Sequence, residues 1–438
     1  MSARALQAYI NDRRVGELRD ENGIWSFTYD PNWHADPAAY PLSPVLSKRE
    51  TAIIDGGSNR PVQWYFDNLL PEEGARQLLA KDAKLDIADA FGLLSAYGAE
   101  SAGSLTLVAG NPPREGAERP LPAADLHSRI ERLPRVPLSH GAAKRMSLAG
   151  AQHKLAIILR GEELFEPVGA NPSTHILKPD SVDPDYPHTA INEYFTMRLA
   201  GALKVGVPST LRRYVPSPIY IVERFDRKAK GDYVERLHLI DACQALNLDR
   251  QFKYREGAVG RLRELAEKCN PAAIVRLNLF RWLVFNVLVG NSDAHLKNIS
   301  FLVDATGLRL APFYDLLAVG VYGTPTFGKK EWPQVPLAFP IEDATTFHEV
   351  SRGTLIEAGK TLGLRADTAA RILNEVADRI EAAARNLLAE IEEENRKLSN
   401  GPAGEMLGGE LRCLRAIIEI VIRDSVSRLK KTTMQMPS

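Results

Sequence analysis

The segment from Ala273 to Gly290 constrains the fold more than any other part of this 438-residue chain, because it is the most apolar long stretch. Four polar side chains interrupt it, namely Arg276, Asn278, Arg281 and Asn286. A membrane-spanning helix needs about 20 predominantly apolar residues, so this segment predicts a buried core helix. The polar turn Gly290–Asn298 follows, and the strand-like Ile299–Val303 comes after it. A polar turn in that place is costly to build unless the loop has a function.

Two side chains of this turn have a spacing that is typical of phosphoryl transfer. Asp293 and Asn298 are five residues apart, and the catalytic loop of protein kinases separates its base Asp from its metal-binding Asn in the same way. A further acidic residue, Asp315, follows the strand-like Leu308–Leu310. Mg²⁺ prefers a carboxylate, an amide oxygen and the phosphates themselves as ligands. The pattern therefore predicts Asp293 as the general base and Asn298 with Asp315 as the metal ligands.

A structural interpretation of the same turn stays open. Asp and Asn are common turn and cap residues, and a bare D-x-x-x-x-N pattern is more often a turn than a catalytic loop. The addition of Asp315 in the expected order favours catalysis. His295 is expected to hold the loop by hydrogen bonds rather than to take part in the chemistry.

Phosphate-handling residues are expected on the N-terminal side of this turn. Lys178 ends a strand-like segment, and Glu193 follows on the next predicted helix. A strand lysine paired with a helix glutamate fixes the α- and β-phosphates in kinases, although a lysine at a strand end is more often only solvent-exposed. The small residues and backbone N–H groups of Ser147–Lys154 suit a phosphate-covering loop. Neither a GxxxxGK[ST] nor a GxGxxG motif occurs in the chain.

The segment Val222–Asp226 is expected to join two lobes, where backbone groups can bind adenine beside Phe225. A strand exit followed by a charged turn is the alternative interpretation. The complete set of predicted nucleotide-binding residues is Ala149, Gly150, Ala151, Gln152, His153, Lys154, Lys178, Glu223, Phe225, His295, Lys297 and Asn298.

The composition fits a globular protein with more than one domain. Hydrophobic residues make up 45% and charged residues 25% of the chain, as in ordinary soluble proteins. With 55 basic and 55 acidic side chains the formal net charge is zero, so no global field attracts the chain to nucleic acid or anionic lipid. The three cysteines are far apart, which argues against disulfides or a cysteine-based zinc site. Residues 1–10 lack the apolar region of a signal peptide, and we expect a cytoplasmic protein without membrane association.

Four regions are predicted along the chain, and together they favour an α+β fold with two lobes. Residues 1–110 form a small mixed domain, and residues 111–145, rich in Pro, Arg and Glu, form a linker. Residues 146–224 form a lobe of mixed strands and helices. Residues 225–438 form an all-α lobe, because apolar residues recur there at helical spacing. Its predicted helices include Ala272–Leu288, Thr354–Leu362, Asp367–Glu394 and Glu410–Leu429.

Set in order, these segments resemble the HipA family of kinase toxins over nearly the full length of the chain. The resemblance is carried by Tyr29–Pro31, Tyr40–Ser43, Phe66–Pro71, Ser147–Lys154, His175–Lys178, Asn192–Glu193, Val222–Arg227, Cys243–Leu246, Gly290–Ser300 and Pro312–Asp315. No single motif has this specificity. His153 departs from the family pattern, in which that position is often acidic or Pro.

The resemblance implies a two-lobed fold related to protein and phosphoinositide kinases, with an extra N-terminal domain on the N-lobe. It implies Mg-ATP as cosubstrate and a protein serine as acceptor, with aminoacyl-tRNA synthetases such as the glutamyl enzyme as targets of some members. Phosphorylation of such a target inhibits translation and promotes growth arrest and persistence. Ser147 would be an inactivating autophosphorylation site. A small helix-turn-helix antitoxin, HipB, would bind the chain and carry most of the contact with operator DNA.

Two other functions remain as alternatives at this point. The same machinery could phosphorylate a lipid or a small molecule, although the neutral charge and the absence of a predicted membrane-binding helix weigh against a lipid. The chain could instead act mainly as a co-repressor scaffold with its antitoxin on DNA. Its intact catalytic pattern argues against that as the only role.

Overall fold

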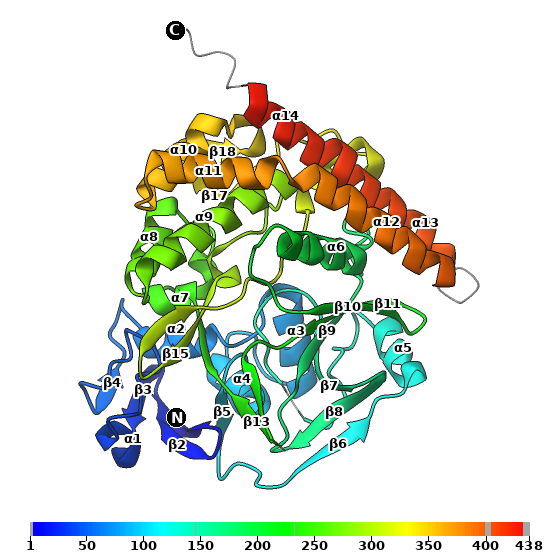
Figure 1. The fold of residues 1–438 in the computed structure, drawn as a ribbon. Coiled ribbons are helices and arrows are strands. Elements are labelled where there is room, and N and C mark those ends of the chain that lie inside the picture. Colours follow the sequence, from blue (N-terminus) through cyan, green and yellow to red (C-terminus); the bar gives the residue numbers. More distant parts are fainter. Residues whose placement is uncertain (1–2, 145, 232, 399–403, 432–438) are drawn as a thin grey trace. The chain divides into compact units, whose positions relative to one another are not determined.

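The computed structural model describes residues 3–144, 146–231, 233–398 and 404–431. The chain divides into two compact units, each assembled from several segments (Figure 1). The first unit contains residues 1–178, 221–252 and 300–311, and the second contains residues 179–220, 253–299 and 312–438. Each unit combines helices with antiparallel strands, so the fold is α+β, as the sequence predicts.

The first unit begins with a five-stranded antiparallel sheet in the spatial order β4-β3-β2-β1-β5. Its strands are β1 (Arg4–Ile10), β2 (Arg13–Glu21), β3 (Ile24–Tyr29), β4 (Ala52–Ile54) and β5 (Leu105–Val108). Alternate residues of β1 and β3 are buried. The alternation of apolar and polar residues in Ala5–Ile10 and Ile24–Tyr29 predicts both strands. The sequence did not indicate β2, because arginines and acids surround its buried Val15 and Leu18.

Four helices accompany this sheet within the first unit, namely α1 (Pro31–Ala35), α2 (Pro61–Asp67), α3 (Glu73–Ala83) and α4 (Ala90–Tyr97). The high proline content of the segment from Pro31 to Pro44 predicts irregular or extended backbone, yet its first residues form α1. The Asp30 side chain accepts a hydrogen bond from the Asn32 backbone N–H and so caps this short helix. Proline is compatible with a first helical turn because its missing N–H would be unpaired there anyway.

A second group of strands follows in the first unit and holds the predicted phosphate loop. The strands are β7 (Leu155–Arg160), β8 (Glu163–Gly169) and β9 (His175–Pro179). The apolar runs Leu155–Leu159 and Thr174–Lys178 predict β7 and β9, whereas β8 is not predicted. The strand β8 pairs with β7 and β6, and β7 pairs with β9. The predicted linker 111–145 contains β6 (Gly116–Pro120) and α5 (Ala123–Glu131), and residue 145 lies outside the described residues. The strand β11 (Pro218–Glu223) spans the boundary between the two units.

The first unit also includes strands from the region 225–438 that is predicted as an all-α lobe. The pair β12 (Arg227–Lys230) and β13 (Tyr233–Arg236) forms a hairpin. The strands β14 (His238–Asp241), β15 (Ser300–Asp304) and β16 (Gly307–Leu310) form an antiparallel sheet, and α7 (Ala242–Leu246) follows β14. Two of them, β15 and β16, match the strand-like segments Ile299–Val303 and Leu308–Leu310. The buried Phe301 and Val303 alternate along β15, which is why a strand is favoured there over a helix.

The second unit is mainly helical. Its helices are α6 (Thr189–Ala202), α8 (Val259–Glu267), α9 (Ala272–Val289), α10 (Arg352–Thr361), α11 (Ala366–Ala377), α12 (Ile380–Leu398), α13 (Gly404–Ala416) and α14 (Arg423–Lys431). It also contains the strand β10 (Thr210–Tyr214) and the short antiparallel pair β17 (Pro336–Ile341) and β18 (Ala344–Thr346). The strand β10 lies in the region 146–224 that is predicted to be mixed, whereas the pair β17 and β18 is absent from the prediction of an all-α lobe at 225–438.

The predicted helix Asp367–Glu394 is two helices in the structure. At the end of helix α11 the Arg379 N–H bonds to the Val376 carbonyl, three residues back. A bond over three residues tightens the last turn of a helix and marks its end. The polar pair Asp378 and Arg379 fits the exposed face of one long helix equally well, so periodicity alone could not locate the break. The last predicted helix is continuous but includes a π-helical segment at Ile417–Ile422.

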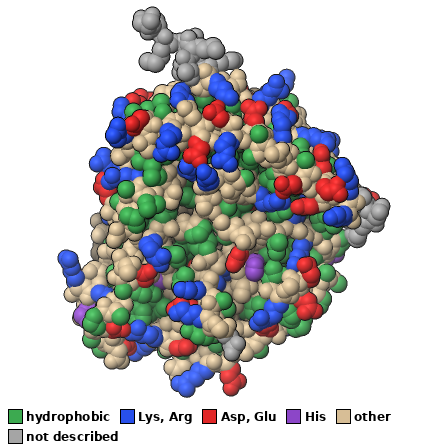
Figure 2. Space-filling view, in the orientation of Figure 1, with side chains coloured by type: hydrophobic (Ala, Val, Ile, Leu, Met, Phe, Trp, Pro, Cys, Tyr) green, Lys and Arg blue, Asp and Glu red, His purple; other side chains and the backbone are tan. Residues whose placement is uncertain are grey.

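Helix α9 is the predicted core helix of the second unit. It is the one described helix that is long and apolar enough to cross a membrane, and 61% of its apolar window is buried inside the structure. Its fully buried side chains include Phe280, Trp282 and Phe285, as expected of a core helix. Basic and acidic side chains are interspersed on the molecular face shown in Figure 2, in keeping with the balanced charge of the chain.

Candidate active site

The turn after α9 is held by a buried pair of amides. Gly290 ends the helix with φ +66°, a left-handed conformation that glycine adopts without strain. The Asn291 side chain donates to Asn286 Oδ1 at 2.7 Å, and its backbone N–H bonds to the Asn286 carbonyl at 2.9 Å. Asn286, which interrupts the apolar stretch of the sequence, therefore fixes the start of the turn. Sequence reasoning noted that interruption but assigned it no role.

Asp293 and Asn298 lie together within this turn. The Asn298 side chain donates to the Asp293 backbone carbonyl at 2.8 Å, and the His295 N–H bonds to the same carbonyl at 2.8 Å. Asn298 and Lys297 are buried, whereas the side chain of Asp293 is 48% exposed. The backbone is thus rigid where the carboxylate is accessible, which is the arrangement that a general base requires.

A tyrosine that sequence reasoning missed contacts the same carboxylate. The Tyr254 hydroxyl donates a hydrogen bond to Asp293 Oδ1, and the Tyr254 ring packs edge-on against the imidazole of His295 with the centroids 4.9 Å apart. Tyr254 lies 39 residues before Asp293 in the chain, in a segment without a recognisable motif. No local sequence signal links the two residues.

The predicted metal-binding loop is joined to the turn that holds Asp293. The Tyr314 hydroxyl donates to the Lys297 carbonyl at 2.8 Å, which connects the neighbour of Asp315 with the neighbour of Asn298. Phe313 stacks on Trp282 of α9 at 5.7 Å. Asp315 itself has φ +59°, an uncommon conformation for a residue other than glycine and one that often marks a functional position.

Glu193, the predicted partner of the phosphate-binding lysine, is buried on α6 in the second unit. Burial raises the pKa of Tyr220 well above its usual value, and the charges of Glu193 and Asp315 raise it further. Both carboxylates therefore lie close enough to Tyr220 to influence its charge. Lys178 belongs to the first unit, and its pairing with Glu193 stays a prediction.

The chemistry of the donor set suits Mg²⁺ bound together with a nucleotide. Asn298 offers an amide oxygen and Asp315 a carboxylate. Mg²⁺ is usually held by one or two protein carboxylates plus substrate phosphates and water. Among the residues that the structure describes, no cluster of three or more His, Cys, Asp or Glu side chains could hold a metal by itself. The phosphates would thus have to complete the coordination shell.

The predicted phosphate loop and Lys178 lie at one end of the same strand pair in the first unit. Leu155 of β7 pairs with Leu177 of β9, so the adjacent positions Lys154 and Lys178 are neighbours at that end of the ladder. Lys154 Nζ donates to the Ala149 carbonyl at 2.5 Å and closes the loop. Burial lowers the pKa of His153, which favours its neutral form, so this departure from the family pattern adds no charge near neutral pH.

The backbone conformation and the contacts of Gly150 shape this loop. Gly150 has φ +108° and forms a parallel bridge with Pro71, and its carbonyl accepts the Glu72 N–H at 3.2 Å. Gln152 is half-buried and Ala151 is exposed. Ser147 is fully buried, and its backbone N–H donates to the Glu100 carbonyl at 2.8 Å. The serine hydroxyl is therefore inaccessible in this conformation.

The residues of the predicted hinge segment differ in their burial. Glu223 is exposed and Phe225 is half-buried. The Arg224 N–H bonds to the Thr174 carbonyl at 2.9 Å, which places Glu223 near the start of β9, whereas Lys178 lies near its end. The adjacent Arg224 and Asp226 are buried and belong to a polar network, so the charged part of this segment is structural.

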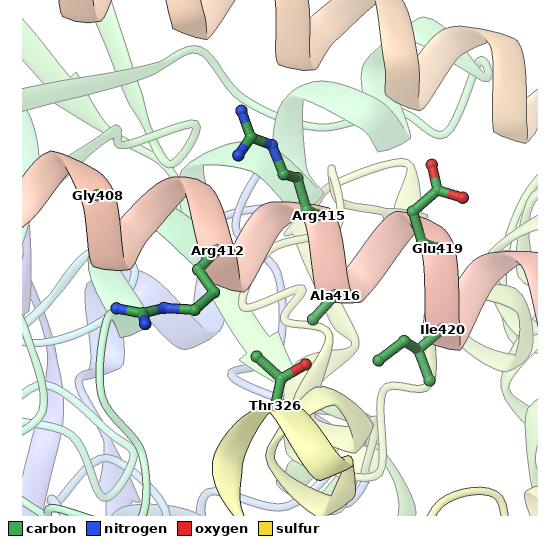
Figure 3. A pocket seen from close by; sticks show the side chains of 7 residues that line it. All are labelled: Thr326, Gly408, Arg412, Arg415, Ala416, Glu419 and Ile420. Atoms are coloured by element: carbon green, nitrogen blue, oxygen red, sulfur yellow. The ribbon is translucent and has the colours of Figure 1, made fainter.

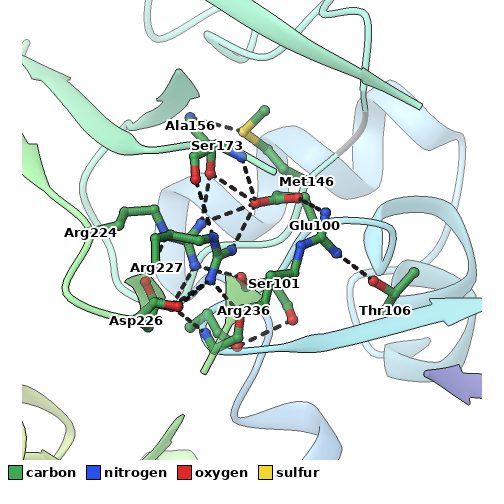
Figure 4. A network of polar contacts seen from close by, with 12 residues as sticks. Glu100, Ser101, Thr106, Met146, Ala156, Ser173, Arg224, Asp226, Arg227 and Arg236 are labelled. Atoms are coloured by element: carbon green, nitrogen blue, oxygen red, sulfur yellow. Dashed lines mark hydrogen bonds and ion pairs between the residues drawn. The ribbon is translucent and has the colours of Figure 1, made fainter. Parts of the chain in front are cut away.

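Glu100 is the centre of that network (Figure 4), which sequence reasoning missed. Its fully buried carboxylate contacts four basic side chains, namely Lys144, Arg224, Arg227 and Arg236. Burial alone would raise the pKa of Glu100, but the four cations lower it well below its usual value. Ser173 Oγ adds a hydrogen bond at 2.8 Å. The partners lie up to 136 residues away in sequence, which explains why no motif reveals the cluster.

A pocket of about 550 Å³ in the second unit is separate from these residues. Figure 3 shows it between the helix that carries Arg412 and the turn that carries Thr326. Its lining residues are Thr326, Gly408, Arg412, Arg415, Ala416, Glu419 and Ile420. None of them is a predicted site residue.

Comparisons with known proteins agree with this geometry. Residues 6–108 match the model of the HipA N-terminal domain, and residues 146–384 match that of the HipA-like C-terminal domain. A protein of Sinorhizobium fredii named "Putative kinase Y4mE" is 36% identical over 74% of this chain and 79% of its own length. The serine/threonine-protein kinase toxin HipA of Shewanella oneidensis is 33% identical over 72% of this chain and 76% of its own.

A solved structure extends the likeness to the whole chain. The Shewanella oneidensis HipA, determined in a complex with HipB and its operator DNA, superimposes with a TM-score of 0.78. The two chains are 28% identical, and the match covers 99% of this chain and 100% of that one.

Proposed function

Since the chain belongs to the HipA family of serine/threonine protein kinases, we propose that it transfers the γ-phosphate of Mg-ATP to a serine hydroxyl of a protein. The observation that carries this proposal is the turn at Asp293, in which the backbone is fixed by Asn298 and His295 while the carboxylate stays accessible. A rigid base at an open position supports proton transfer from an incoming hydroxyl.

Each predicted residue has a role in this reaction. Asp293 accepts the proton of the serine hydroxyl as its oxygen attacks the γ-phosphorus, and the bond to the β-γ bridging oxygen breaks. Asn298 and Asp315 would hold Mg²⁺, which neutralises the charge that develops on the phosphates. Lys178, oriented by Glu193, would contact the α- and β-phosphates. His295 and Lys297 support the turn from which Asp293 acts.

The loop Ser147–Lys154 would cover the phosphates, and the hinge at Glu223 and Phe225 would hold the adenine. We further propose that Ser147 is an inactivating autophosphorylation site. Because this serine is buried, the loop must leave its position before the hydroxyl can react. Phosphorylation adds nearly two negative charges to Ser147, so the phosphorylated residue could not return to its buried site beside the Glu100 backbone.

The proposed substrate is a protein of the translation machinery, with an aminoacyl-tRNA synthetase such as the glutamyl enzyme as the first candidate. Its phosphorylation would inhibit translation and cause growth arrest and persistence. The proposal is supported by the name of the Shewanella oneidensis relative, which is a serine/threonine-protein kinase toxin. A cytoplasmic location follows from such a substrate.

A helix-turn-helix antitoxin is the proposed protein partner. The similar HipA chain was determined with HipB and operator DNA, which supports an antitoxin complex here. The net charge of this chain is zero, so we expect the antitoxin to supply most of the affinity for DNA. A co-repressor role would then exist beside the kinase activity. A lipid or small-molecule substrate is the less favoured alternative.

Phosphate transfer from labelled Mg-ATP tests the proposal, with wild-type protein, Asp293→Ala and Ser147→Ala compared by mass spectrometry of the labelled sites. Label on Ser147 in the wild type that disappears in Asp293→Ala supports both assignments. If the wild type is already phosphorylated, the Ser147→Ala protein should label other proteins in a cell lysate. Absence of transfer in both proteins would refute the kinase proposal and favour the scaffold.

A further inference from the structure

The Asp293 carboxylate is contacted by a side chain that the proposed reaction does not yet use. The Tyr254 hydroxyl donates to Asp293 Oδ1, and His295 Nε2 lies 3.8 Å from the same oxygen. The Tyr254 side chain is itself partly open to solvent, with 39% of the residue exposed. A phenol thus holds one oxygen of the predicted base, at a position open to solvent.

Tyr254 is anchored to the catalytic turn by more than this hydrogen bond. Its ring meets the His295 ring edge-on, at an interplanar angle of 77°, and Lys253 Nζ lies 5.1 Å from the ring centroid. The Leu296 N–H bonds to the Lys253 carbonyl at 3.2 Å. The ring contact with His295 and the backbone bond to Leu296 therefore fix the segment at Tyr254 to the turn. Tyr254 and Asp293 are thus held in a constant relative position.

We infer that Tyr254 is a positioning residue for the general base, and this inference rests on the proposed role of Asp293. A carboxylate on a short side chain rotates about its terminal bond unless a partner fixes it. The phenol donates a hydrogen bond but is not needed for the proton transfer itself. By holding Oδ1, it orients the carboxylate so that the other oxygen can accept the proton of the substrate.

The opposite role would be that of a placeholder. In that case the Tyr254 hydroxyl occupies the position of the substrate hydroxyl and must leave before transfer. The anchoring of the ring and of the Lys253 backbone to the turn argues against such movement, because departure would break these contacts as well. The two roles predict opposite effects of removing the hydroxyl.

Tyr254→Phe separates them, because it keeps the ring contacts with His295 and Lys253 and removes only the oxygen. The full-length protein carrying Ser147→Ala is the background, so that autophosphorylation does not obscure the rates. Tyr233→Phe is the matched control, since Tyr233 is 62% exposed on β13 of the first unit. The readouts are kcat and the KM for ATP in phosphorylation of a lysate protein, and the Tm of each variant.

We expect Tyr254→Phe to lower kcat roughly tenfold, a part of the contribution that general bases make, with an unchanged KM for ATP. A merely structural defect would raise the KM for ATP and lower Tm together with kcat, and that result would overturn the inference. Tyr233→Phe should match the background protein.

An equal or higher kcat in Tyr254→Phe would also contradict positioning and identify the hydroxyl as a placeholder. These results leave the proposed function intact as long as the background protein is active and Asp293→Ala is not. If the background protein transfers no phosphate, or if Asp293→Ala is fully active, the proposed function fails first and the role of Tyr254 fails with it.

Discussion

His238 shows how a single buried residue can set the pH dependence of stability. Its Nε2 lies 2.8 Å from the Leu42 carbonyl and its Nδ1 lies 3.0 Å from Ser104 Oγ. A neutral ring that donates from Nε2 and accepts at Nδ1 satisfies both contacts. Burial lowers the pKa of His238 to about 4, and the bond to Leu42 opposes this shift only in part.

We therefore expect the free energy of unfolding to fall as the pH is lowered from 6.5 to about 4. In this range the unfolded chain binds a proton at His238 and the folded chain does not, so protonation favours unfolding. Between pH 6.5 and pH 5 the loss is about 2 kcal/mol from this residue. Urea unfolding at several pH values gives the free energy of unfolding as a function of pH. This free energy should depend less steeply on pH in His238→Gln, with the exposed His348→Gln as control. An unchanged pH dependence in His238→Gln would contradict the role of His238.

Glu100 is a second buried residue on which the stability of the first unit is expected to depend. Burial, together with the neighbouring Arg224, lowers the pKa of Arg227 to about 10, so this arginine is still charged at neutral pH. Removing the central carboxylate would leave four buried cations with too little negative charge.

Glu100→Gln is expected to lower the free energy of unfolding by about 3–5 kcal/mol, the cost of breaking a buried ion pair by removing one partner. Chemical denaturation of the purified variant measures this difference. Glu357→Gln serves as the control, because its contact with Lys360 is exposed and such pairs contribute less than about 1 kcal/mol. Similar values for both variants would mean that the network contributes little to stability.

At the scale of elements, the sequence predicted those with strong periodicity and missed those fixed by distant partners. Helix α9 and the polar turn after it could be predicted because burial and polarity change sharply at Gly290. The strand β2 could not be predicted, because charged residues interrupt its apolar pattern. The break at Asp378 could not be predicted, because its charged residues also fit the exposed face of a continuous helix. Tyr254 and Glu100 were missed for a further reason, since their partners are distant in sequence and only the folded chain brings them together.

The packing of α10 on α11 depends on one glycine. A Cβ on Gly359 would lie 2.5 Å from the Ala369 Cβ and 3.3 Å from the Phe280 ring, so these helices approach more closely than a side chain allows. Gly359→Ala should destabilise the protein by about 1–3 kcal/mol through overpacking.

Thermal and urea unfolding of this variant measure the effect, with Gly353→Ala as the matched control. Gly353 is exposed on the same helix, and its Cβ would meet only Ser351 Oγ at 3.5 Å. Alanine there should be neutral or slightly stabilising, because it is the better helix former. Equal stability of both variants would refute the close approach of α10 and α11.

At the scale of the whole molecule, nucleotide binding should be visible as stabilisation of the folded chain. A ligand at 100 times its Kd adds about 2.7 kcal/mol to the free energy of unfolding, so Mg-ATP should raise Tm. Removal of Mg²⁺ with EDTA should reduce this rise in the wild type. In Asp315→Ala the rise should be small with or without Mg²⁺, since a proposed metal ligand is missing. A full Mg²⁺-dependent rise in Asp315→Ala would exclude Asp315 as that ligand.

The most direct test of the account is phosphate transfer to a protein serine by the Ser147→Ala chain and by its Asp293→Asn derivative. Both are supplied with labelled Mg-ATP and a cell lysate, and the acceptor residue is identified by mass spectrometry. We predict phosphoserine on a lysate protein with the first chain and a decrease of at least about 100-fold with the second, because a positioned base contributes that much to transfer. Equal transfer by both chains would contradict the role of Asp293, and no transfer by either would contradict the kinase itself.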